Sequence, residues 1–185
     1  MIRRALLSTL CVTPLLAACT AGMSARGGAD TGGTGMRSAT ATLQDPNGAA
    51  RGTARITQTS GGLAVRVDAT GLPPGQHGLH IHMVGRCDAP DFSSAGGHWN
   101  PTGKSHGFED PRGPHHGDLP NLAIGSDGRG AVDYVVPGAD LAGGASDPLD
   151  ADGAAMVIHA QADDYRTDPS GNSGGRIACG VFRRS

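Results

Sequence analysis

Six histidines and one aspartate restrict most strongly what this chain of 185 residues can fold into. Five of the histidines and the aspartate lie between residues 80 and 118, and the sixth histidine follows at the end of a later apolar run. All seven side chains can bind metal ions through nitrogen or oxygen. A fold that uses them together must bring two distant parts of the chain to one place. The seven residues are His80, His82, His98, His106, His115, Asp118 and His159.

The pattern of apolar residues predicts an all-β domain. Residues 63–69 alternate between apolar and polar side chains with a period of two, which is typical of a half-buried strand. Short strands separated by Gly-rich turns favour an antiparallel sandwich or barrel, and no stretch shows helical periodicity over three turns. The other seven strands are expected at residues 38–43, 52–59, 79–83, 122–124, 131–136, 155–159 and 177–182.

Two long segments interrupt this pattern, at residues 84–121 and 160–175. Loops of this length inside a compact domain are usually functional or disordered. The first segment holds most of the histidines, and a cysteine lies near each segment. We therefore expect two long functional loops on a scaffold of strands.

Two metal sites that share one ligand can be drawn from these residues. Four imidazoles suit copper, which favours nitrogen ligands, whereas three imidazoles and one carboxylate suit four-coordinate zinc. The sets overlap only at His98, which would have to lose both ring protons and bridge the metals as an imidazolate. The copper set is His80, His82, His98 and His159, and the zinc set is His98, His106, His115 and Asp118.

The pair His80 and His82 is the best ordered part of this prediction. Because alternate residues of a strand project from the same face, both imidazoles are expected to point one way. Taken alone, such a pair is more often simply hydrogen-bonded than bound to metal. His159, at the end of another expected strand, would supply a third nitrogen if the two strands adjoin.

The first residues predict export. Arg3 and Arg4 precede a mostly apolar stretch at residues 5–18, which is too short to span a bilayer as a helix. We expect a signal peptide over residues 1–18, and its last residues before Cys19 resemble a bacterial lipoprotein signal. An ordinary secretory signal that happens to contain a cysteine is the alternative.

In the lipoprotein interpretation, the thiol of Cys19 carries a lipid and anchors the protein to a membrane. Residues 19–37 are rich in Gly, Ala, Ser and Thr, so they are expected to form a flexible tether. Residues 38–185 would then form a single domain in the periplasm or at the cell surface.

The cysteines predict one disulfide in that domain. Cys11 lies in the signal and Cys19 is the lipidation candidate, which leaves Cys87 and Cys179. Two remaining cysteines in an exported chain indicate one long-range disulfide.

The charge pattern argues against nucleic acid as a partner. The chain has 15 basic and 17 acidic side chains. It contains no Lys/Arg cluster with interleaved aromatic residues, so nucleic-acid binding is not expected.

Residues 38–185 resemble a bacterial copper/zinc superoxide dismutase. The resemblance covers essentially the whole domain, and every candidate metal ligand falls on a motif position of that family. The most specific motifs are Gly78-Leu79-His80-Ile81-His82, Gly96-Gly97-His98-Trp99-Asn100-Pro101, His115-His116-Gly117-Asp118, Val157-Ile158-His159, Ala162-Asp163-Asp164 and Gly174-Gly175-Arg176-Ile177-Ala178-Cys179.

The resemblance implies an eight-stranded antiparallel Greek-key barrel or sandwich with one copper and one zinc ion per chain. It implies dismutation of superoxide to dioxygen and hydrogen peroxide, which would protect the cell envelope. Asp163 would link a copper imidazole to a zinc imidazole, and Cys87 and Cys179 would form the family's disulfide. His98 would deliver a proton, and Arg176 would hold superoxide beside copper.

Other interpretations stay open at this point. A non-enzymatic relative of the same fold could store or deliver copper and zinc at the envelope. A domain held together by structural zinc alone would leave His80, His82 and His159 without a role. Arg176 could merely hydrogen-bond backbone carbonyls near Cys179, and the protein could be a monomer or a homodimer.

Overall fold

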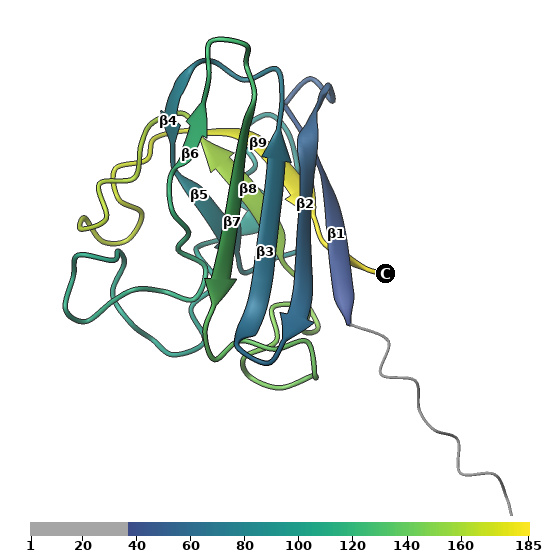
Figure 1. The fold of residues 1–185 in the computed structure, drawn as a ribbon, viewed down its shortest axis with the longest axis vertical. Helices are drawn as coiled ribbons and strands as arrows, with labels where there is room; N and C mark the ends of the chain where they lie inside the picture. The colour runs from purple at the N-terminus through teal and green to yellow at the C-terminus, as the bar shows by residue number, and fades with distance from the viewer. Residues whose placement is uncertain (1–36) are drawn as a thin grey trace, which may run out of the picture. The chain divides into compact units, whose positions relative to one another are not determined.

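The computed structural model describes residues 37–185, which form ten β-strands and one short 3-10 helix (Figure 1). The expected signal peptide, Cys19 and all of the expected tether except Arg37 lie outside these residues. Within them, the structure has no helix with the length and apolar character needed to cross a membrane. The strands are β1 (Ser38–Gln44), β2 (Ala50–Thr59), β3 (Gly62–Ala69), β4 (Gly75–His77), β5 (Leu79–His82), β6 (Leu122–Ile124), β7 (Gly130–Val136), β8 (Ala155–His159), β9 (Arg176–Val181) and β10 (Arg183–Arg184), and the 3-10 helix is η1 (Ser93–Ala95).

Eight of the strands form one antiparallel sheet that curls on itself. Its order is β5-β8-β9-β1-β2-β3-β7, and β10 pairs with β1 as the eighth strand. In Figure 1, β1, β2, β3 and β7 lie in front of β5, β8 and β9, so the curled sheet forms two facing layers. β7 and β8 are consecutive in the chain but lie near opposite ends of this sheet, so residues 137–154 make a crossover of the Greek-key kind. The predicted all-β antiparallel fold is confirmed.

The core between the layers follows from the alternation of side chains along the strands. On β3, the apolar residues Leu63, Val65 and Val67 are buried, whereas Arg66 and Asp68 between them are exposed. Alternate residues of a strand face opposite sides of a sheet, so one side of β3 packs into the core and the other faces water. This strand was predicted from its period of two.

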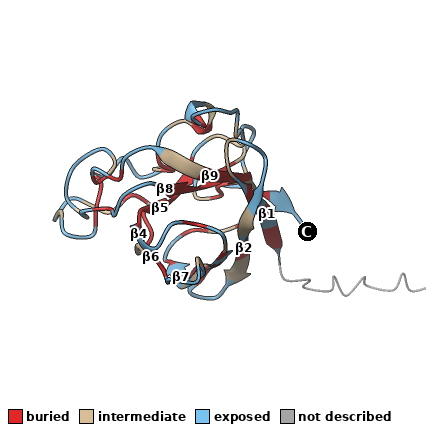
Figure 2. Cartoon of the chain, turned by 90° about the horizontal axis from the view of Figure 1, so that it is seen from above, coloured by how far each residue is buried: buried red, intermediate tan, exposed pale blue. Residues whose placement is uncertain are grey.

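β5 and β8 depart from this alternation, because every residue of both strands is buried (Figure 2). Their apolar residues on one face, including Ile81 and Ile158, belong to the main core. The opposite face carries His80 and His82 and is covered by the long loops. The loops therefore bury a polar face of the sheet, and that face holds the candidate site.

Two strands were not predicted. β4 follows Pro73 and Pro74, and the three residues of this strand pair only with β6. β10 consists of Arg183 and Arg184, which pair with Thr40 and Ala39 of β1. Both strands are too short to show a periodic pattern, so only their pairing partners reveal them.

Candidate metal centre

The candidate site is built where loop 83–121 folds back along β5. The Trp99 N–H donates to the Ile81 carbonyl and the Ile81 N–H donates to the Gly117 carbonyl, both at 2.8 Å. This approach requires glycine at position 117, because a Cβ atom there would lie 2.3 Å from the Ile81 carbonyl oxygen. The loop thereby lays His98 opposite His82, and Asp118 opposite His80, as isolated β-bridges.

β8 brings the last histidine of the expected copper set to the same place. β5 pairs with β8 in the register that sets His80 opposite Val157, and His159 ends β8. Ligand atoms of His80, His82, His98 and His159 all lie within 4.8 Å of one another, and all four residues are buried. The two predicted strands do adjoin, as a shared metal site requires.

The hydrogen bonds around these imidazoles leave one nitrogen of each ring facing inward. His82 donates from Nδ1 to the Gly96 carbonyl at 2.9 Å, and His159 donates from Nδ1 to the Gly174 carbonyl at 3.1 Å. A carbonyl oxygen only accepts, so each ring keeps its lone pair on Nε2, and these two Nε2 atoms lie 3.4 Å apart. Such an outer hydrogen bond orients a metal-binding imidazole.

Two buried nitrogens in this cluster have no hydrogen-bond partner among the described residues: Nδ1 of His80 and Nε2 of His98. A buried polar atom without a partner is costly, so a native site that contains two of them calls for a ligand. Both atoms belong to the copper set, and both are lone-pair donors in a neutral imidazole. The residues present therefore fit a metal ion at this position.

The expected zinc set converges on one carboxylate oxygen. Oδ1 of Asp118 lies 2.9 Å from His98 Nδ1, 3.1 Å from His106 Nδ1 and 3.3 Å from His115 Nδ1. The other oxygen, Oδ2, accepts the backbone N–H groups of Gly107 and His115, which fixes the carboxylate in place. Three imidazole nitrogens and one carboxylate oxygen are a donor set that zinc binds.

His115 lies farther out than the other members of this set. The four residues on this side whose ligand atoms all lie within 4.8 Å of one another include His80 in its place, together with His98, His106 and Asp118. His80, however, directs Nε2 to Asp163, whereas Nδ1 of His115 is 3.5 Å from Nδ1 of His98. The hydrogen bonds therefore favour His115 as the fourth zinc ligand.

His98 is the point where the two sets meet. Its Nδ1 faces the carboxylate of Asp118, and its Nε2 is the unpartnered atom on the side of the copper set. Its ring centroid lies 3.9 Å from that of His80 and 5.5 Å from that of His115. One ring thus presents a nitrogen to each cluster.

Asp163 connects the two clusters behind His98. Its Oδ2 accepts from His80 Nε2 at 2.7 Å, and its Oδ1 accepts from His106 Nε2 at 2.9 Å. The side chain of Asn121 holds the backbone of Asp163 on both sides, at 2.8 Å from its N–H and 2.8 Å from its carbonyl. The sequence had not indicated this role for Asn121.

Burial keeps the imidazoles of the copper set neutral. It lowers the pKa of His80 to about 3 and that of His159 to about 4, and it also lowers the pKa of His82 and His98. The positive charges that neighbouring imidazoles would carry act in the same direction for His80 and His82. Neutral imidazole is the form that binds a single metal ion, so His80, His82 and His159 are prepared for a cation without prior loss of protons.

The zinc side has the opposite electrostatic character. Burial opposes charge on His106, but hydrogen bonds to Asp118 and Asp163 outweigh it and raise the pKa of His106 to about 9. The hydrogen bonds from His106, together with those from the neighbouring histidines, hold the pKa of both carboxyl groups below the usual value in spite of burial. Both carboxylates thus stay ionised in spite of burial, and the ring of His106 lies between them.

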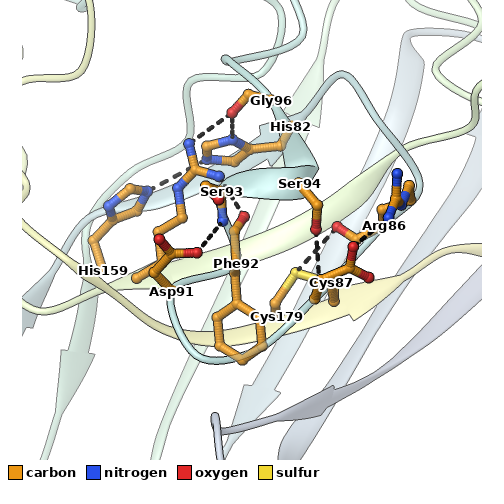
Figure 3. Close-up of a disulfide and its surroundings, with 12 residues drawn as sticks. His82, Arg86, Cys87, Asp91, Phe92, Ser93, Ser94, Gly96, His159 and Cys179 are labelled. Carbon is orange, nitrogen blue, oxygen red and sulfur yellow. Dashed lines mark hydrogen bonds and ion pairs between the residues drawn. A yellow bond between two sulfur atoms is a disulfide. The ribbon is translucent and has the colours of Figure 1, made fainter.

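The predicted disulfide between Cys87 and Cys179 is confirmed, and it ties the start of loop 83–121 to β9 (Figure 3). On the same strand, Arg176 donates from Nη1 to the Phe92 carbonyl and from Nη2 to the Gly96 carbonyl, both at 2.6 Å. The carbonyl of Gly96 also accepts from His82. The carbonyl oxygen of Gly96 in loop 83–121 thus holds both Arg176 and His82, a candidate copper ligand. The sequence did not indicate this contact.

A pocket of about 440 Å³ opens onto the copper set. His82, His98 and His159 line it, and Arg176 is the only lining residue with a fixed positive charge. Burial lowers the pKa of Arg176 and the charge of Asp91 raises it, but a guanidinium keeps its proton in proteins. The pocket therefore suits a small anion next to the copper set.

Two histidines do not join either set. His77 is buried, and its ring nitrogens lie 2.8 Å from the His159 carbonyl and 2.9 Å from the Pro73 carbonyl. His116 packs against Trp99, with ring centroids 5.2 Å apart, and is half-buried. Both were left without a metal role from the sequence.

Comparisons with known proteins agree with this arrangement. A sequence model of the family described as copper/zinc superoxide dismutase (SODC) matches residues 50–182. The superoxide dismutase-like protein YojM of Bacillus subtilis is 51% identical over 123 residues, which span 65% of this chain and 63% of the length of YojM. The Cu-Zn superoxide dismutase of Deinococcus radiodurans is 41% identical over 187 residues, 95% of this chain and 97% of the relative. The crystal structure of a SOD-like protein from Bacillus subtilis matches with a TM-score of 0.73 and 47% identity, covering 77% of this chain and 96% of the other.

Proposed function

Because the chain belongs to an enzyme family, the copper/zinc superoxide dismutases, we propose that it dismutates superoxide to dioxygen and hydrogen peroxide. One copper and one zinc ion per chain would serve this reaction. The observation that carries the proposal is His98, which presents Nδ1 to the zinc set and an unpartnered Nε2 to the copper set. A domain stabilised by structural zinc alone would not explain why Nε2 of His98 is buried without a partner.

Each metal would be held by the set that the structure assembles for it. Copper would be held by His80 Nδ1 and the Nε2 atoms of the other three histidines, and zinc by Asp118 Oδ1 and the Nδ1 atoms near it. Asp163 orients one imidazole of each set from behind. The copper residues are His80, His82, His98 and His159, and the zinc residues are His98, His106, His115 and Asp118.

The residues of the pocket divide the reaction between them. Copper, when bound, would supply the alternating one-electron oxidation and reduction. Arg176 holds the superoxide anion in the pocket by charge. His98 takes up a proton at Nε2 and gives it to the second superoxide, and a further proton from water completes hydrogen peroxide. Two superoxide ions and two protons thereby give one dioxygen and one hydrogen peroxide.

The reaction would take place outside the cytoplasm. The disulfide between Cys87 and Cys179 is typical of exported proteins, and the N-terminal sequence has the features of a bacterial lipoprotein signal. A relative from Brugia pahangi, 36% identical over 152 residues, is named an extracellular Cu-Zn superoxide dismutase. We infer export to the periplasm or the cell surface, with Cys19 as the lipid anchor.

A second candidate function is copper and zinc storage or delivery without catalysis. The "superoxide dismutase-like" name of YojM favours it. This alternative does not need an arginine in the pocket, whereas here Arg176 lines the pocket together with three histidines of the copper set. The arrangement therefore supports the enzyme better.

The rate of superoxide consumption distinguishes these functions. We expect protein loaded with copper and zinc to consume superoxide rapidly, and the same protein loaded with zinc alone to show only the background rate. The zinc-only sample is the matched control, since it keeps the fold but lacks a redox-active ion. Full copper and zinc occupancy with no consumption above free-copper controls would leave storage or delivery as the function.

A further inference from the structure

Gly171 lies directly against the carboxylate that connects the two metal sets. A Cβ atom at this position would be 1.9 Å from Asp163 Oδ1, 2.5 Å from its Cγ and 2.7 Å from His106 Nε2. Real Cβ atoms essentially never approach heavy atoms below 3.0 Å, so any side chain at this position forces a shift. The affected atoms are those that join Asp163 to His106.

The carboxylate of Asp163 is fixed in place and cannot move to accommodate such a shift. Its side chain is fully buried, and both of its oxygens accept hydrogen bonds from candidate metal ligands. Oδ1, the atom nearest to Gly171, also accepts the backbone N–H of Tyr165 at 2.7 Å. A displacement large enough to clear a methyl group would therefore lengthen the bond to His106.

We propose that Gly171 is a positioning residue for the metal pair, because its missing side chain leaves the space that the bridging carboxylate of Asp163 occupies. The inference deepens the proposed function and rests on it for the identity of the two metals. Gly171 acts through Asp163, which fixes the ring of His106 on the zinc side and the ring of His80 on the copper side. Outer hydrogen bonds of this kind hold metal-binding imidazoles in orientation and raise their basicity.

Gly171 could alternatively be needed only for its backbone conformation. Its φ is +61°, in the left-handed region that favours glycine, and its N–H and carbonyl bond to Thr167 and Asp164. Gly103 separates the two explanations. Its φ is +63°, and a Cβ there would meet nothing within 4 Å. Alanine at position 103 thus carries the same backbone strain without the contact.

The test compares zinc affinity of Gly171→Ala and Gly103→Ala by competition with a chelator. We expect Gly171→Ala to weaken zinc binding by about tenfold or more, the range for loss of an outer ligand partner, and Gly103→Ala to stay near the wild type. Cobalt bound in place of zinc provides a second measurement, because a changed orientation of His106 alters the absorption bands of the cobalt ion. Equal affinities and equal cobalt spectra for the two variants would overturn the proposal.

A double-mutant cycle with Asp163→Ala shows whether Gly171 acts through the carboxylate. We expect Gly171→Ala to cost about threefold or less in zinc affinity once the carboxylate is gone, whereas an additive loss contradicts the mechanism. If Gly171→Ala alone does not fold, the double variant decides the question. A double variant that is as stable as Asp163→Ala supports the contact between Gly171 and Asp163, and a double variant that does not fold rejects it. Zinc affinity is measured without superoxide, so a wild-type protein that binds both metals but is inactive would refute the proposed function only.

Discussion

Replacing His159 with alanine is expected to abolish copper binding while zinc stays bound. His159 belongs to the copper set alone, and its Nε2 faces that of His82 at 3.4 Å. Without this imidazole, three ligands remain for copper, but the zinc set keeps all four of its members. Superoxide consumption should fall with the copper content, by about a hundredfold or more, because the protein then lacks its redox-active ion.

Metal analysis and the superoxide assay on the same sample check this result. His116→Ala is the matched control, because His116 is a half-buried histidine of loop 83–121 that joins neither set. It should keep both metals and nearly full activity. If His159→Ala retains one copper per chain, His159 is not a copper ligand.

Arg176→Ile is expected to keep both metals and lose about tenfold or more in superoxide consumption, equivalent to about 1.4 kcal/mol. Superoxide is small and has little shape to recognise, so a charge in the pocket must do most of the positioning. Arg176 carries the only fixed positive charge among the residues that line the pocket. Arg176→Lys should retain more activity than Arg176→Ile, because it restores the charge without the two-pronged donor.

The structure gives Arg176 a second role that this experiment must separate from the first. Its guanidinium donates to the carbonyls of Phe92 and Gly96, so it also holds this part of loop 83–121 against β9. A loss of copper or a lower melting temperature in Arg176→Ile would report that structural role. Near wild-type turnover at full copper occupancy would show that Arg176 does not position the substrate.

The scaffold of the site could be predicted from local sequence patterns. The period of two in residues 63–69 identified β3, and the pair His80 and His82 identified the face of β5 that carries candidate ligands. Both predictions rest on geometry within one strand. The two histidine-bearing strands also adjoin as expected, with His80 opposite Val157 of β8.

Contacts between segments far apart in the chain could not be predicted in the same way. The Gly96 carbonyl accepts from both His82 and Arg176, but any residue has a carbonyl, so the sequence holds no sign of it. The need for glycine at positions 117 and 171 could not be predicted either, because it depends on which backbone or side-chain group packs against each glycine. β10 could not be predicted because it forms only by pairing with β1, at the other end of the domain sequence.

The central claim is that two metal ions share His98, and the metal content of the reconstituted protein tests it most directly. Protein exposed to both ions and then dialysed should contain one copper and one zinc per chain by elemental analysis. That result follows from two four-ligand sets with a single residue in common. One zinc per chain with no tightly bound copper would contradict the claim, and the enzymatic function would fall with it.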